Sequence, residues 1–187
     1  MKELSPNKQK ILLLLFTGIA LGFSYSPNRQ GKIIKAFSKE WKRIDQKKVS
    51  KEIAELYRSK LIKTKENPDG SITLFLTDKG KMKALNYRYK DMKISKQKWD
   101  GQWRMVIADV PEQLGHAKTR YARDALRSKL LKFGFYPLQK SVWIAPWECE
   151  QEIEFIIEYL GLREYTRYGT LSKIDNDLHL RKIFSLA

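Results

Sequence analysis

A single aspartate, Asp109, stands where this sequence could place metal-dependent chemistry. It directly follows the apolar run 103–108 and precedes Val110 and Pro111. A carboxylate at the end of a buried strand can hold Mg²⁺ or Mn²⁺ for phosphodiester hydrolysis. One carboxylate is not a metal site, but a symmetric dimer brings two together, and the paired charges then require a cation or a shared proton. The alternative is that Asp109 caps the turn into the following helix, and the residues alone favour this cap.

The other residue types form no second catalytic pattern. His116 and His179 are not spaced as metal ligands with Cys149. The sequence has no glycine-rich phosphate loop and no Ser-His or Cys-His pair that predicts a nucleophile. A single cysteine cannot form an intrachain disulfide, which agrees with a cytoplasmic location. We therefore expect binding to need no cofactor, and Mg or Mn to be required only if the protein is a nuclease.

Positive charge is concentrated in the first half of the chain. Of the formal net charge of +16, residues 1–98 carry +15 and residues 99–187 carry +1. The candidate nucleic-acid contacts are basic residues of this first half, namely Lys32, Lys35, Lys39, Lys47, Lys48, Lys51, Arg58, Lys63 and Lys65. Such a set attracts polyanions, and its ammonium groups contact phosphates with little reading of base sequence. We predict nucleic acid, most simply double-stranded DNA, as the partner, and no membrane.

The first half has the pattern of three helices and a hairpin. Apolar spacing predicts helices over about residues 7–22, 30–44 and 46–60. Two β-prone runs flank the turn 67–70, of sequence Asn-Pro-Asp-Gly, and predict a hairpin. Thr77 or Asp78 is the expected N-cap of a short closing helix. Together these elements predict a winged helix over residues 1–85, whose third helix, with Lys47 at its front end, enters the major groove.

The second half alternates between strands and helices. The predicted order is a strand at 103–108, a helix at 116–133, strands at 135–138 and 141–145, a helix at 148–160 and a strand at 164–171. This βαββαβ order is the ferredoxin-like arrangement, so the fold class is α+β. Residues 86–98 are polar and are expected to form a linker before this domain, which spans residues 99–187. The tail from Asp175 to Leu186 is expected to pair with or pack on a neighbouring element.

Three arginines of the predicted helix 116–133 are weaker candidates for nucleic-acid binding. Arg120, Arg123 and Arg127 have the spacing i, i+3 and i+7, which places them on one outer face. They could direct a phosphate backbone toward Asp109. The following helix is acidic and the whole half is nearly neutral, so charge pairing is the favoured interpretation.

Three segments of the second half resemble the PaaX-like transcriptional repressors. They are Trp-Asp-Gly-Gln-Trp-Arg at 99–104, Val-Ile-Ala-Asp-Val-Pro-Glu at 106–112, and Leu-Lys-Phe-Gly-Phe-Tyr-Pro-Leu-Gln-Lys-Ser-Val-Trp at 131–143. In that family a winged helix is joined to a domain similar to the small CRISPR-associated nuclease Cas-two (Cas2). The resemblance covers roughly residues 5–185 and implies a ferredoxin-like domain that forms a homodimer.

The resemblance also bears on Asp109 and on the end of the chain. Cas-two nucleases carry an Asp at the end of the first strand, and two copies hold a divalent metal across the dimer. This implies a shared metal site at Asp109 and leaves metal ligand and turn cap as equal alternatives. Ser141 and Trp143 lie near a matching motif, where we expect a structural role. The longer repressors have an additional C-terminal helical domain that is not expected here, so effector sensing by an acyl-CoA ligand is not expected either.

Two hypotheses therefore remain open. The first is a homodimeric, winged-helix, DNA-binding transcriptional regulator. The second is a metal-dependent (Mg or Mn) endonuclease in which Asp109 pairs across the dimer. The first is favoured, because the positive charge lies on the binding half and the other half offers only one candidate ligand per chain.

Overall fold

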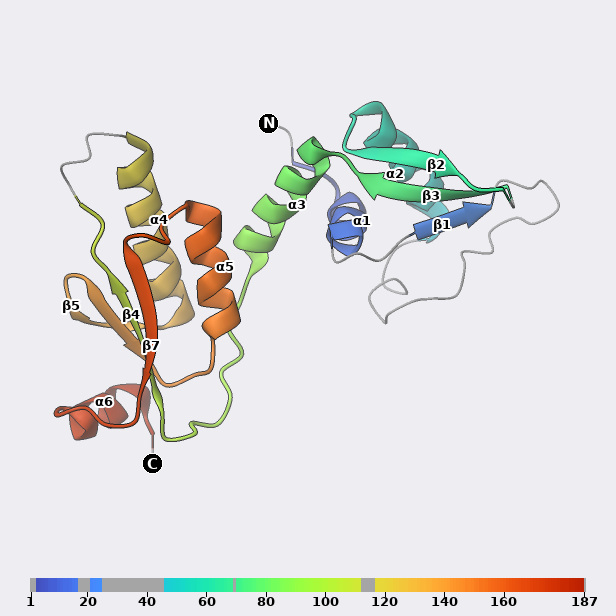
Figure 1. The fold of residues 1–187 in the computed structure, drawn as a ribbon. Helices are drawn as coiled ribbons and strands as arrows, with labels where there is room; N and C mark the ends of the chain where they lie inside the picture. The colour runs from blue at the N-terminus through green and yellow to red at the C-terminus, as the bar shows by residue number, and fades with distance from the viewer. Residues whose placement is uncertain (1–2, 17–20, 25–45, 69, 112–116, 187) are drawn as a thin grey trace. The chain divides into compact units, whose positions relative to one another are not determined.

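The chain folds into two compact units of mixed helix and sheet, seen in a computed structural model (Figure 1). The structure describes residues 3–16, 21–24, 46–68, 70–111 and 117–186. The first unit comprises Met1–Asp91 and the second comprises Met92–Ala187. No helix in these described ranges is long and apolar enough to cross a membrane.

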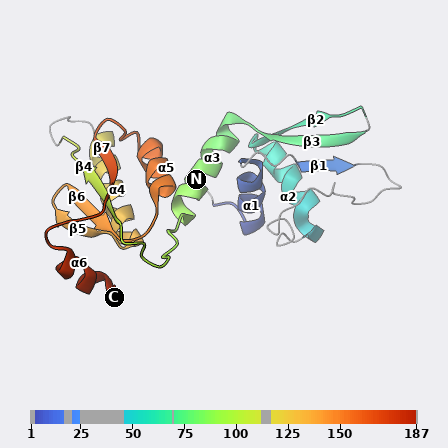
Figure 2. The ribbon, with the colours of Figure 1, turned by 60° about the horizontal axis from the view of Figure 1, so that its bottom comes forward.

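The first unit combines helices with a small antiparallel sheet. Its elements are α1 (Pro6–Phe16), β1 (Leu21–Ser24), α2 (Gln46–Arg58), β2 (Ile62–Glu66), β3 (Ser71–Leu76) and α3 (Asp78–Asp91). The strand order is β1-β3-β2, and both pairings are antiparallel. Fully buried Ile11 and Leu12 of α1, Leu56 of α2 and Ile62 of β2 form the core. Helix α1 lies between α2 and α3 in both views (Figures 1 and 2).

The prediction of a helix over residues 7–22 is wrong at its C-terminal end. Helix α1 ends at Phe16, and residues 21–24 form strand β1, in which Leu21 pairs with Leu74. Short apolar runs are compatible with either a helix or a strand, and here pairing with β3 decides between them. The predicted helix over residues 30–44 lies outside the described residues.

The predicted third helix and hairpin are confirmed. Helix α2 is followed by β2 and β3. In the turn, the N–H of Gly70 donates to the carbonyl of Asn67 at 2.9 Å, and Gly70 has a φ of 75°. A left-handed residue at this point of the turn favours glycine, as the sequence predicts. Thr77 is the N-cap of α3, because its Oγ1 accepts the N–H of Gly80 at 3.1 Å.

Helix α3 begins against the backbone of Leu61. A Cβ added to Gly80 would stand 1.9 Å from the carbonyl oxygen of Leu61, so only glycine permits this approach. The same carbonyl accepts the N–H of Thr77 at 3.1 Å. Helix α3 continues to Asp91, so the first part of segment 86–98, predicted as a linker, is helical.

The second unit has the predicted ferredoxin-like topology. Its elements are β4 (Trp103–Ala108), α4 (Ala117–Phe133), β5 (Tyr136–Gln139), β6 (Val142–Ala145), α5 (Glu150–Leu160), β7 (Thr166–Leu171) and α6 (Asp177–Phe184). The strand order is β5-β6-β4-β7, with every neighbouring pair antiparallel. This order places β4 centrally and leaves β5 and β7 at the edges.

The C-terminal helix α6 packs on the sheet of its own unit. Its Leu180 is fully buried in a cluster with Trp103 and Ile144, and Phe184 packs against the same cluster. The indole N–H of Trp103 donates to Asp177 Oδ1 at 2.8 Å. The expectation that the tail packs on a neighbouring element is therefore met within the chain.

A buried arginine joins the start of β4 to the loop before α5. Arg104 is 4% exposed, and its guanidinium forms a two-point pair with Asp100 at 2.6 and 2.7 Å. It also donates to Glu148 Oε2 at 2.6 Å and to the carbonyl of Gln102 at 2.8 Å. Hydrogen bonding to Arg104 lowers the pKa of Asp100 from 3.8 to about 2 and lowers the pKa of Glu148. A buried guanidinium requires such partners, because a lone buried charge is strongly destabilising.

Gly80→Ala should destabilise the first unit by about 2 kcal/mol, the usual range for an overpacked site. Alanine gains roughly 1 kcal/mol of helix propensity over glycine, but its methyl group meets a backbone oxygen that cannot move without shifting β2. Urea unfolding measures the change. Gly169→Ala is the matched control, since a Cβ there has nothing within 4 Å; equal stability of the two variants would contradict the argument.

Protonation of Asp100 should destabilise the second unit in acid. The pKa of Asp100 is lower in the folded state than in the unfolded state. The stabilisation that ionised Asp100 provides is therefore complete above the unfolded-state pKa near 3.8, and it is lost as the pH falls towards about 2. Urea unfolding followed by tryptophan fluorescence at pH 7, 4 and 2.5 tests this. The stability difference between the wild type and Asp100→Asn should shrink over that interval, and a constant difference would exclude this role.

Candidate nucleic-acid interface

Helix α2 presents a basic face opposite its buried side. Val49 is 2% exposed and Leu56 is fully buried, which fixes the inward side of the helix. Lys48, Lys51 and Arg58 are all exposed. Amphipathic spacing therefore places three cations of α2 in solvent, where they can reach an anionic partner.

The acidic residues of α2 are engaged with α1 and with Ser5, the residue directly before it. The hydroxyl of Ser5 donates to Glu52 Oε1 at 2.7 Å, and the ammonium group of Lys8 pairs with Glu55. The hydrogen bond from Lys8 lowers the pKa of Glu55, which keeps this carboxylate charged. These contacts tie α2 to α1 and place its two carboxylates on the α1 side.

The hairpin extends the basic surface along an edge strand. Four successive residues of β2, Lys63 to Glu66, are exposed. Lys63 pairs with Phe75, which is 40% exposed, and Lys65 pairs with Thr73. Directly opposed residues share one face of a hairpin. That face therefore carries two lysines and an aromatic ring.

The structure describes the side chains of five of the nine predicted basic residues of the first half, and all five are exposed. Lys48, Lys51 and Arg58 lie on α2, and Lys63 and Lys65 lie on the next strand. Lys47 belongs to α2, but the structure does not describe its side chain. Lys32, Lys35 and Lys39 lie outside the described residues. Exposed Tyr57 and Phe75 were not predicted. Each follows a leucine in the sequence, so no local signal distinguishes them from buried residues.

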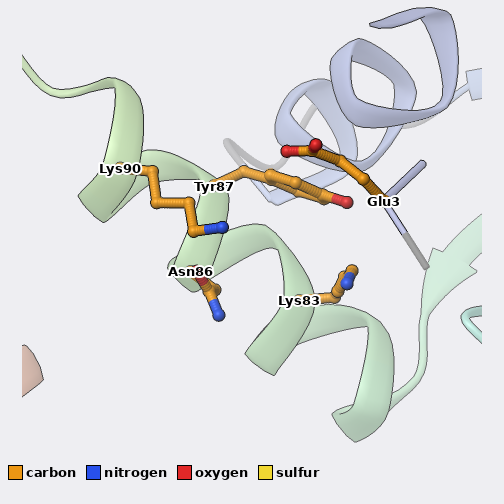
Figure 3. Close-up of a pocket in the computed structure, with 5 residues that line it drawn as sticks. All are labelled: Glu3, Lys83, Asn86, Tyr87 and Lys90. Carbon is orange, nitrogen blue, oxygen red and sulfur yellow. The ribbon is translucent and has the colours of Figure 1, made fainter. Parts of the chain in front are cut away.

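A polar pocket lies on the other side of α1, between the start of the chain and α3 (Figure 3). It is lined by Glu3, Lys83, Asn86, Tyr87 and Lys90. Tyr87 is only 3% exposed, and its hydroxyl accepts the N–H of Leu4 at 3.1 Å. Two lysines could attract an anion here, but the carboxylate of Glu3 opposes one. The basic surface of α2 and the hairpin is the better candidate for a polyanion.

Asp109 follows the central strand of the second unit, as predicted. It is exposed, and its N–H donates to the carbonyl of Tyr165 at 3.0 Å. Its carboxylate accepts no hydrogen bond from the described part of the chain, which omits residues 112–116. This geometry leaves the carboxylate facing solvent, and it does not decide between metal ligand and turn cap.

Other polar groups near that strand have structural contacts. Trp143 is buried opposite Val106, and the carbonyl of Ser141 accepts the N–H of Ala108 at 2.8 Å. Burial raises the pKa of the Cys149 thiol to about 12, so it is protonated at neutral pH. Among the residues placed by the structure, no three His, Cys, Asp or Glu side chains gather as metal ligands.

The three arginines of α4 lie in partly paired surroundings. Arg120 is exposed, whereas Arg123 pairs with Asp124 at 3.4 Å and Arg127 donates to the carbonyl of Lys140 at 3.1 Å. Two of the three therefore have contacts within their own unit. Only the Arg123 contact is an ion pair, so charge pairing with the acidic helix remains a prediction.

The fold and the site define a two-unit α+β protein, with a basic helix-and-hairpin surface on one unit and a ferredoxin-like sheet in the other. Residues 96–179 match the family model described as the PaaX protein central Cas2-like domain. This match supports a PaaX-like family, and it confirms the predicted resemblance for residues 96–179. No curated protein matches the chain.

Asp109→Ala should change the free energy of unfolding by less than about 0.5 kcal/mol, the usual range for a surface position without a specific contact. Urea unfolding with and without Mg²⁺ measures this. A decrease of about 1 kcal/mol in the free energy of unfolding, measured without metal, would instead identify a turn cap. Stabilisation of the wild type by Mg²⁺, absent from Asp109→Ala, would identify a metal ligand.

Proposed function

We propose that this protein is a DNA-binding transcriptional regulator of the PaaX family and acts as a homodimer. The observation that carries the proposal is the exposure of Lys48, Lys51 and Arg58 on one helix that leads directly into a basic hairpin. Binding itself needs no cofactor in this proposal.

The arrangement of the first unit supports a winged helix as the DNA-binding module. A helix, a strand, a second helix and a hairpin follow one another, and the first strand pairs with the hairpin in the order β1-β3-β2. In a winged helix, the helix before the hairpin enters the major groove and the hairpin lies beside the backbone. Here those elements are α2 and the hairpin of β2 and β3.

The sheet of the second unit supports dimer formation. Trp103, Met105 and Ile107 share one face of β4 because side chains alternate along a strand. Helix α6 covers the Trp103 end, whereas Ile107 is 36% exposed. An apolar residue on a partly open face, beside edge strands, suits contact with a second copy. Two copies would present two basic surfaces to one duplex.

The comparison favours a regulator over the nuclease hypothesis. The matched domain is the central domain of a PaaX protein, and the proposed DNA contacts lie on the other unit. Asp109 is the single candidate ligand that each chain would offer to a shared Mg²⁺ or Mn²⁺. We therefore place DNA binding in the first unit and retain metal binding at Asp109 as a separate, testable property.

Lys48→Glu with Lys51→Glu, in the full chain, should weaken duplex DNA binding by well over tenfold. Both side chains are exposed, so the double variant should stay folded while losing two phosphate contacts and gaining repulsion. Fluorescence anisotropy against salt concentration measures affinity. If the wild type neutralises about six to eight phosphates, log K against log salt should have a slope near −5 to −7, and a shallower slope is expected in the variant.

A control with the same change in net charge separates the interface from general electrostatics. Lys132→Glu with Lys173→Glu reverses two exposed lysines of the second unit and should leave affinity within about twofold. Equal losses in the two double variants would show that total charge, and not the α2 surface, controls binding. No binding by the wild type would reject the proposed function.

A further inference from the structure

The exposed side of α2 carries a line of side chains that are not cations. Ser50, Ala54 and Tyr57 are all exposed and have the spacing i, i+4 and i+7, which places them along one stripe of the helix. Tyr57 is 54% exposed, although it directly follows fully buried Leu56. A ring of this size left in solvent on a helix is a candidate contact surface.

This line lies on a different flank of α2 from the contacts to α1. Glu52 accepts from Ser5, just before α1, and Glu55 pairs with Lys8 of α1, so both carboxylates lie on the α1 side and not along the line. The cations Lys51 and Arg58 lie beside the line on the exposed face. The helix therefore offers phosphates a cationic zone and offers base edges a zone of small and aromatic groups.

The chemistry of the line selects one feature of the major groove. Between Lys48 and Arg58, α2 has no Asn or Gln for a two-point contact to adenine. Its two carboxylates, which could accept from cytosine, are engaged with Ser5 and with Lys8 of α1. The methyl of Ala54 and the ring of Tyr57 are apolar groups, and the apolar feature of the groove is the 5-methyl group of thymine. The small side chains of Ser50 and Ala54 also let the helix backbone approach the groove floor.

We infer that Ala54 and Tyr57 read thymine by contacting its methyl group, so the preferred DNA site has a T·A pair beneath the middle of α2. This inference rests on the proposed function, because it requires α2 to enter the major groove. The lysines and Arg58 supply affinity for any duplex, and the Ala54–Tyr57 pair supplies discrimination between sequences.

Replacing thymine by deoxyuridine tests the inference, since the change removes only the methyl group. A preferred duplex is first selected by the full-length wild type from a random library, and each thymine is then replaced in turn. Burial of one methyl group is worth about fourfold in affinity. We expect a loss of about fourfold at one thymine per half-site and little change elsewhere.

Two variants show which side chains make the contact. Tyr57→Ala should remove most of the penalty at the same thymine while keeping the salt dependence of binding. Phe75→Ala is the matched control, because it removes an exposed aromatic ring from the hairpin and should leave the penalty unchanged. Ala54 is exposed on a helix, so Ala54→Gln is expected to fold. This variant should shift the selected base from thymine towards adenine.

The outcomes separate this inference from the function beneath it. Salt-dependent binding with no deoxyuridine penalty at any position would overturn the inference and leave the proposed function in place. A penalty that persists in both Tyr57→Ala and Ala54→Gln would assign thymine reading to another part of the protein and would also overturn it. Absence of duplex binding by the wild type would overturn both.

Discussion

The backbone of Leu61 is the point on which the first unit depends. Its N–H donates to the carbonyl of Leu56 at 3.0 Å, which closes the C-terminal turn of α2, and its carbonyl accepts from Thr77. Lys60 adopts a left-handed conformation to make this turn, and Gly80 allows α3 to approach the same carbonyl. One residue thereby fixes where α2 ends, where the hairpin begins and where α3 starts. The relative position of α2 and the hairpin, on which the proposed DNA contact relies, follows from this junction.

The two units use their charges in opposite ways. In the second unit the buried guanidinium of Arg104 is surrounded by the carboxylates of Asp100 and Glu148, and two arginines of α4 have local partners. In the first unit the carboxylates of α2 turn towards α1. Charge in the second unit is therefore used for cohesion, whereas the excess in the first unit is presented to solvent.

The sequence predicted those elements whose signals are local. The Asn-Pro-Asp-Gly turn, the Thr77 cap and the alternation of strands and helices after residue 99 are decided within a few residues, and all are confirmed. Strand β1 was missed because Leu21 to Ser24 become a strand only by pairing with β3, about fifty residues away. At the candidate site, the basic residues and their positions along the helix were predicted from the sequence. The exposure of Tyr57 was not, because neighbouring Leu56 is equally apolar and only packing distinguishes them.

Affinity and specificity have different physical requirements, and α2 can meet both because its faces differ. Phosphate contacts need mobile, solvated cations and tolerate any base sequence. Reading a methyl group needs a short side chain beside a rigid ring, close enough to exclude water. Turning Glu52 and Glu55 towards α1 leaves the remaining surface free of negative charge, so the apolar line can approach DNA without repelling it. In the proposed complex, the polar contacts of Glu52 and Glu55 would therefore have a role beyond stability, since they would determine which side of α2 meets the duplex.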